Sequence, residues 1–210
     1  MLSKKMIASE SVKLFNKHGL NNVGVRDISK HLNISPGNLS YHFPKKENLI
    51  IFISEQLMKL NSEAFGVYRK IENPSLFEFL KLIKQLHLNF YVFRGVVQDF
   101  AEVSRIFERE NYRYEEVEKQ RELIYLDLLS CLEKTGELNL SGDDMKFLIS
   151  SIKFFTRFWI VEAFVSFKGK SKLETVGYYL KMFCKQLSLF ASSKGNKSIE
   201  KFLSTELQRM

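Results

Sequence analysis

Apolar residues recur every three or four positions through most of the chain, which places them on one face of an α-helix. The first such stretch covers residues 3–18, and two shorter ones cover residues 25–32 and 36–43. A longer stretch follows over residues 45–69. The later apolar runs are mostly longer than about 15 residues and keep helical spacing, so the pattern predicts helices and no sheet.

Helix breakers are few and fall at defined places. The chain has only 3 prolines and 10 glycines, and no proline lies beyond Pro74. Long helices separated by short breaks are therefore expected in the later part of the chain. The expected breaks lie near Pro74, Gly95, Asn111, residues 136–142 and residues 169–171.

Capping signals accompany the first helices. Gly19 suits the end of the first helix, because glycine adopts a left-handed conformation easily. Asn33 suits a tight turn after the second helix, and Ser35 followed by Pro36 suits the start of the third. Two short helices joined by a tight turn, with a third bracing them, indicate a helix-turn-helix.

The basic charge gathers at the N-terminus. The 210 residues carry a formal net charge of +8, and residues 1–50 hold eight basic and three acidic side chains. Such a segment favours a polyanionic partner, although a solvated surface would have the same composition. The chain lacks a signal-peptide core, an apolar run of membrane-spanning length and enough cysteines for a disulfide scaffold, so we expect a cytoplasmic protein without membrane contact.

The third helix has an outer polar face once the inward-facing Leu39 and Phe43 are set aside. The amide of Asn38 suits adenine in the major groove, and Gly37 permits close approach of the backbone. A packed aromatic role for Tyr41 and a partly buried role for His42 are the alternatives. The candidate DNA contacts are Arg26, Ser35, Pro36, Gly37, Asn38, Ser40, Tyr41, His42 and Lys46.

Four segments here follow one another at a definite spacing: Arg26-Asp27-Ile28, Leu32-Asn33-Ile34-Ser35, Gly37-Asn38-Leu39-Ser40-Tyr41-His42-Phe43 and Lys45-Lys46-Glu47-Asn48-Leu49. With Ala8, Leu14, Phe15 and Gly19, they resemble the DNA-binding domain of the TetR family of bacterial transcription regulators. The resemblance covers about the first 55 residues. It departs from the family pattern at Val25, where a threonine is usual, and at Asn33, which replaces the turn glycine.

The resemblance implies a second domain that binds a small molecule and dimerises through its last two long helices as a four-helix bundle. The residues support this independently, because the helix over residues 147–167 is apolar on more than one stripe and must be buried on several sides. A purely internal core is the alternative. The candidate dimer residues are Ile152, Phe155, Trp159, Phe164, Tyr179 and Phe183.

A ligand pocket is expected among the helices between Leu76 and Leu132. Its apolar, aromatic character favours a hydrophobic or aromatic small-molecule effector. Because His87 and the two cysteines are isolated in sequence, we expect a buried neutral histidine and apolar thiols, with no metal and no cofactor. The candidate lining residues are Leu86, Phe90, Phe93, Phe100, Val103, Phe107, Tyr125 and Leu129.

The sequence thus predicts an all-α protein: a three-helix DNA-binding domain over residues 1–48 and a larger ligand-binding and dimerisation domain over residues 49–192. The helix over about residues 45–69 links the two. A polar stretch at residues 192–197 is expected to be a linker within a C-terminal tail, residues 193–210, which can end in a short helix.

The expected function is a ligand-responsive repressor that binds a palindromic operator in double-stranded DNA as a homodimer. An enzyme is disfavoured, because the chain has no Gly-rich phosphate loop, no His-Glu metal spacing and no nucleophile elbow. Two alternatives stay open. One is a TetR-like DNA binder without a ligand, and the other is a helical carrier of hydrophobic molecules.

Overall fold

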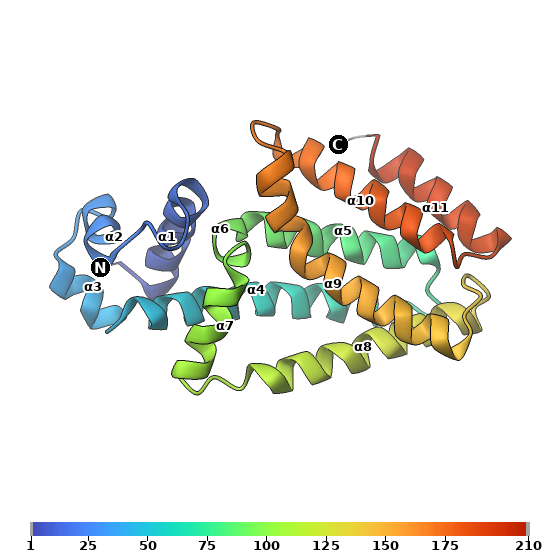
Figure 1. Cartoon of the computed structure of the whole chain (residues 1–210), viewed down its shortest axis with the longest axis horizontal. Helices are drawn as coiled ribbons and strands as arrows, with labels where there is room; N and C mark the ends of the chain where they lie inside the picture. Colours follow the sequence, from blue (N-terminus) through green and yellow to red (C-terminus); the bar gives the residue numbers. More distant parts are fainter. Residues whose placement is uncertain (1, 209–210) are drawn as a thin grey trace. The chain divides into compact units, whose positions relative to one another are not determined.

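The computed structural model describes residues 2–208, which form eleven helices and no strand (Figure 1). An isolated bridge joins Leu138 and Ala191. The all-α prediction is therefore confirmed. The helices are α1 Lys4–His18, α2 Val25–His31, α3 Pro36–His42, α4 Lys46–Tyr68, α5 Leu76–Val92, α6 Arg94–Val97, α7 Phe100–Arg109, α8 Tyr114–Lys134, α9 Gly142–Ser166, α10 Lys172–Ser188 and α11 Ser193–Glu206.

The chain divides into two compact units. The first contains Met1–Leu60 and Val92–Tyr114, and the second contains Asn61–Tyr91 and Glu115–Met210. Helix α4 contributes its first part to one unit and its last part to the other. The short helices α6 and α7 group with the N-terminal helices, although they are distant from them in sequence.

The first unit is built on local caps and a small apolar core. The hydroxyl of Ser3 accepts a hydrogen bond from the backbone N–H of Met6, and Gly19 ends α1 with a φ of 83°. These signals begin and end α1 close to the expected positions. The core side chains, all buried, are Ile7, Phe15, Leu20, Val23, Ile28, Leu39, Leu49 and Ile53.

Helix α6 lies directly against the backbone of α1 in this unit. The Asn16 side chain donates from Nδ2 to the carbonyl of Val92 at 2.8 Å and accepts at Oδ1 from the N–H of Gly95 at 2.7 Å. A Cβ on Gly95 would stand 2.2 Å from the carbonyl carbon of Phe15, so only glycine fits. The contact therefore ties residues 92–97 to the helix-turn-helix side of the chain.

The second unit contains α5, α8, α9, α10 and α11, and a buried carboxylate holds one end of it. Glu137 accepts hydrogen bonds from the Leu76 N–H at 3.1 Å and the Ser198 hydroxyl at 2.7 Å. The ammonium of Lys194 lies 3.5 Å from its other oxygen. The start of α5 and the first turns of α11 are thus pinned to the α8–α9 connection.

Helix α11 begins at Ser193 and includes most of the stretch expected to be a polar linker. The Ser192 hydroxyl caps it by accepting from the Gly195 N–H at 3.1 Å. A Cβ on Gly195 would lie 2.1 Å from the Glu137 carbonyl oxygen. Polar composition hid this helix, because its capping serine and its close-packed glycine both look like linker residues.

Among the described residues, no helix combines the length and hydropathy needed to cross a membrane.

Candidate nucleic-acid interface

Helix α3 carries the expected polar face. The Ser35 hydroxyl accepts from the Asn38 N–H at 3.1 Å, and Pro36 occupies the first turn. Leu39 is buried, and Phe43, which caps the end of α3, is buried with it. The residues left exposed on α3 and at its start are Ser35, Pro36, Gly37, Asn38, Ser40 and Tyr41.

The turn before α3 holds that helix against α2. Asn33 adopts a φ of 54°, the left-handed conformation expected of the residue that replaces the family's turn glycine. The Ile34 N–H donates to the Ser29 carbonyl at 3.0 Å. Gly24 is the N-cap of α2, and its N–H donates to the Asp27 carboxylate at 2.8 Å. Arg26 is exposed on the first turn of this helix.

Tyr41 and His42 differ in exposure. The Tyr41 side chain is 78% exposed, so a packed aromatic role is excluded within this chain. The His42 ring lies edge-on to it at 5.3 Å and is half-buried. Its Nε2 is buried and has no hydrogen-bond partner in the described part of the chain.

Lys46 points into the first unit. Its ammonium donates to the Leu20 carbonyl at 2.6 Å and lies 5.7 Å from the centre of the Phe15 ring. Burial lowers the pKa of Lys46, and nearby carboxylates, Glu47 first among them, oppose that shift only in part. This lysine braces the segment after α1, whereas the sequence pattern suggested a phosphate contact.

Two other lysines near α3 were not among the sequence candidates. The exposed ammonium of Lys45 lies 3.3 Å from the carboxylate of Glu110, at the end of α7. Lys4, at the start of α1, stands 5.6 Å from the Phe43 ring centre. Both lysines lie in the basic N-terminal segment, which was the available sign of a DNA contact. Position in the sequence could not show that Lys45 points outward and Lys46 inward.

The chain is similar to known proteins in sequence near its N-terminus and in fold over most of its length. The family described as "Bacterial regulatory proteins, tetR family" matches residues 7–51, which span α1, α2, α3 and the start of α4. Residues 7–51 therefore form a DNA-binding domain of the TetR type, the kind found in bacterial regulatory proteins.

Solved structures share the fold of this chain across nearly its whole length. A TetR-family transcriptional regulator from Marinobacter aquaeolei VT8 has a TM-score of 0.82 at 18% identity, over 96% of this chain and 99% of that one. The ketosteroid transcriptional regulator KstR2 of Mycobacterium tuberculosis has 0.67 at 16%, over 90% and 95%. A TetR-family regulator from Pectobacterium atrosepticum has 0.60 at 13%, over 91% and 95%. No curated protein matches the sequence.

The candidate pocket residues fall into both units. Phe93, Phe100, Val103 and Phe107 belong to the first unit. Leu86, Phe90, Tyr125 and Leu129 belong to the second. Most of them are buried, with Phe90 and Phe100 half-buried.

The candidate dimer residues lie mostly inside the chain's own fold. Only Phe164 is exposed, at 60%, and Phe155 is half-buried. The other four are packed within the second unit, so they cannot contact a second copy directly. These buried residues are Ile152, Trp159, Tyr179 and Phe183.

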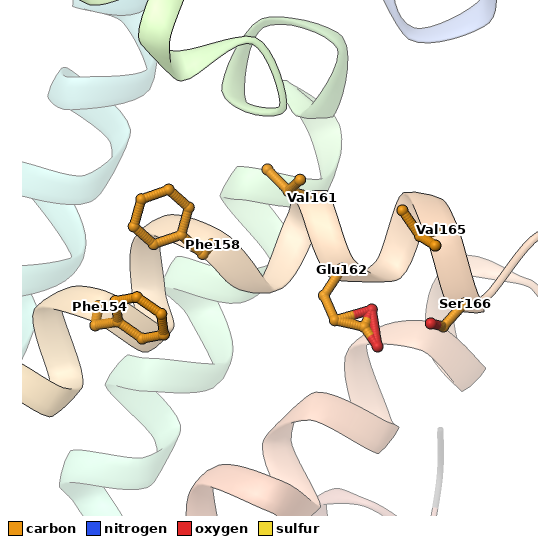
Figure 2. A pocket seen from close by; sticks show the side chains of 6 residues that line it. All are labelled: Phe154, Phe158, Val161, Glu162, Val165 and Ser166. Atoms are coloured by element: carbon orange, nitrogen blue, oxygen red, sulfur yellow. The ribbon is translucent and has the colours of Figure 1, made fainter.

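A different stripe of α9 faces outward. Figure 2 shows side chains on successive turns of the helix, among them Phe154, Phe158 and Val165. They line an open groove of about 600 Å³ together with Val161, Glu162 and Ser166. Phe154 is 68% exposed although its ring packs on Phe158 at 5.0 Å. The outward apolar surface of α9 is therefore a neighbouring stripe to the one that the buried candidates Ile152 and Trp159 occupy.

Proposed function

We propose that this regulator binds a palindromic operator as a homodimer and that a hydrophobic effector changes its affinity for DNA. The observation that carries the proposal is the exposed polar face of α3, held in place by a capped start and a buried Leu39. A short helix of this kind fits the major groove, where its side chains meet base edges.

We assign base readout to Asn38 and Ser40, and close backbone approach to Gly37. Arg26, Tyr41 and His42 would contact phosphates beside them, with Ser35 and Pro36 at the helix start. Lys45 takes the phosphate contact first expected of Lys46, because Lys45 is exposed and Lys46 is committed to the Leu20 carbonyl. Residues 1–48 would then form the DNA-reading part and residues 49–192 the sensing and dimerising part.

A two-helix apolar face on α9 and α10 supports the dimer. The two helices pack through Phe155 and Tyr179, whose rings lie 6.4 Å apart. Each also carries apolar side chains on the side that its own core does not cover. These exposed residues are Phe147, Phe154, Phe158 and Val165 on α9, Tyr178 and Met182 on α10, and Leu189 at the C-terminal cap of α10.

A face of this kind needs cover from water, and a second copy offers the same surface through two-fold symmetry. Two copies of α9 and α10 would form a four-helix bundle. The dimer would present two α3 helices about 34–36 Å apart, which matches successive major grooves on one side of B-DNA. Such a regulator would act in the cytoplasm, on chromosomal DNA.

A hydrophobic or aromatic effector suits the aromatic interior of the second unit. One structural neighbour is named as a ketosteroid transcriptional regulator, which agrees with an apolar effector class. The effector can shift DNA binding only if it binds the DNA-competent and incompetent forms with different affinity. Helix α4, which runs from the first unit into the second, is the covalent path for that coupling.

The salt dependence of binding to duplex DNA tests the DNA-binding part of the proposal. We expect the logarithm of the association constant to fall linearly with the logarithm of salt concentration, by about 0.9 per phosphate contact. A helical carrier of hydrophobic molecules would show no such slope. A regulator without an effector would show the slope but would bind no apolar probe.

A further inference from the structure

Two of the buried polar atoms in the second unit that have no hydrogen-bond partner in the described chain belong to rings in contact with each other. One is Nε2 of His87 on α5, and the other is Nε1 of Trp159 on α9. The two rings stack with their centres 4.7 Å apart and their planes 24° from parallel. Leaving a buried donor or acceptor unpaired costs about 1–3 kcal/mol for each group. A bound molecule that hydrogen-bonds both atoms would therefore be stabilised at this pair.

The hydrogen-bonding character of each atom is fixed by chemistry. His87 is 0% exposed, and its Nδ1 lies 2.9 Å from the Ile83 carbonyl, which can only accept. Nδ1 therefore carries the proton, and Nε2 presents a lone pair. Burial lowers the pKa of His87 to about 4, so the ring is neutral near pH 7. The Trp159 Nε1–H is a donor only.

The surrounding side chains supply no polar partner. Phe155 and Phe183 have ring centres 6.0 Å and 6.2 Å from that of His87. Tyr179 lies 5.3 Å from Trp159, but its hydroxyl already donates to Glu162 at 3.2 Å. Thr156 lies on α9 with Trp159, but its hydroxyl already donates to the Ile152 carbonyl at 2.7 Å.

We infer that the His87–Trp159 stack receives the hydroxyl group of a neutral alcohol or phenol with an apolar body. One hydroxyl both donates to Nε2 and accepts from Nε1–H. A carbonyl oxygen would satisfy Trp159 alone, and an ammonium would satisfy His87 alone. The aromatic surroundings disfavour a charged ligand, because burying an unpaired charge is far more costly than burying a hydroxyl.

The place of the stack connects this site to regulation. The stack lies on α5 and α9, and its neighbours Phe183 and Tyr179 lie on α10. The outer sides of α9 and α10 carry the proposed dimer face. A ligand inserted at the inner side would change the packing of the two helices that set the dimer. This alcohol or phenol would be the effector, so the inference rests on the proposed function, in which an effector changes the affinity for DNA.

The single tryptophan of the chain makes the test site-specific. Protein labelled with ¹⁵N gives one indole N–H signal, which is followed while the full chain is titrated with phenol or with toluene. We expect phenol to shift this signal downfield and to bind at least about tenfold more tightly than toluene, a difference of about 1.4 kcal/mol. In His87→Phe, toluene should bind more tightly than phenol.

His18→Phe is the matched control, because it removes an exposed histidine from the first unit and should keep the phenol preference. Equal preference in the wild type and His87→Phe would overturn the inference. An indole signal at a hydrogen-bonded position before titration and unmoved by phenol would also overturn it, since a resident water then fills the site. DNA binding measured on the same samples tests the proposed function separately, so a failed ligand inference can be told from a failed DNA-binding proposal. If His87→Phe does not fold, the titration of the wild-type protein alone still tests the ligand inference.

Discussion

The side chain of Asn16 accepts a hydrogen bond from the backbone N–H of Gly95 at 2.7 Å, and this bond joins two helices far apart in sequence. The same amide donates to the carbonyl of Val92. Residues 92–97 therefore stay with α1 as long as this amide is present. The chain passes from the second unit into the first at the end of α5, between Tyr91 and Val92.

Gly95→Ala should destabilise the protein markedly, by about 2 kcal/mol or more, because its methyl group would overlap the backbone of Phe15. Asn16→Ala should cost about 1–3 kcal/mol through the loss of two hydrogen bonds. Urea unfolding measures both. Gly66→Ala on α4 is the control, since its Cβ would meet nothing within 4 Å, and it should be neutral or stabilising by up to about 1 kcal/mol. A Gly95→Ala protein as stable as the wild type would contradict the close contact.

Lys45 and Lys46 are neighbours with different partners, so their substitutions should separate. Lys45→Ala should weaken binding to all duplexes about equally and reduce the salt slope by about one phosphate contact. Lys46→Ala should mainly lower thermal stability, because the Leu20 carbonyl loses its donor. Binding isotherms at several salt concentrations, with thermal melts of the same proteins, give both quantities. A larger slope change in Lys46→Ala than in Lys45→Ala would contradict the assignment.

Substitutions on α3 should separate base readout from phosphate contact. Asn38→Ala should relax the preference at one operator position by about 1–3 kcal/mol, because a base edge loses its hydrogen-bond partner. His42→Ala should instead weaken binding to every sequence to a similar extent. Competition between duplexes that differ at single positions distinguishes the two patterns, and a uniform loss in Asn38→Ala would refute its role in base readout.

Phe154→Glu or Phe158→Glu should produce monomers by placing a charge on the proposed dimer face. DNA affinity should fall steeply when the dimer is lost, since one α3 helix then binds alone. Sedimentation velocity gives the mass directly. Leu123→Glu is the matched control, because Leu123 is similarly exposed but lies on α8. Dimers in both Phe variants would move the interface elsewhere.

His87 links stability to pH. Its pKa is about 4 in the folded protein against 6.5 as its usual value, so between these values the unfolded chain binds a proton that the folded protein does not. Stability must therefore fall as pH decreases from about 6.5 to about 4, by about 2 kcal/mol between pH 7 and pH 5 from this group alone. His87→Phe should lack this component. Urea unfolding at the two pH values measures it, and an identical pH dependence in both proteins would show that His87 is not buried in the neutral form.

Local signals explain why the N-terminal helices were predictable. Ser35, Asn33 and Gly19 act within a few residues of their own position, so their roles as cap, turn and helix end follow from residue type. The breaks near Asn111 and residues 136–142 follow for the same reason. Asn111 has a φ of 52°, and α8 ends at Lys134 before α9 begins at Gly142.

Tertiary choices were not predictable in this way. Helix α9 has several apolar stripes, and periodicity cannot tell which stripe faces its own core and which faces outward. Trp159 therefore looked like an interface residue although it is buried, and Phe154 was passed over although it is exposed. The direction of the Lys46 side chain was equally hidden, because its partner is a backbone carbonyl.

Selection of bound duplexes from a pool of random DNA tests the central claim most directly. The account predicts that the full-length protein enriches a palindrome whose half-site centres lie about 10 base pairs, one helical turn, apart. It also predicts that the Asn38→Ala protein enriches the same palindrome with one symmetric pair of positions relaxed. Enrichment of a single non-repeated site, or of no sequence at all, would contradict a dimer that reads DNA through α3.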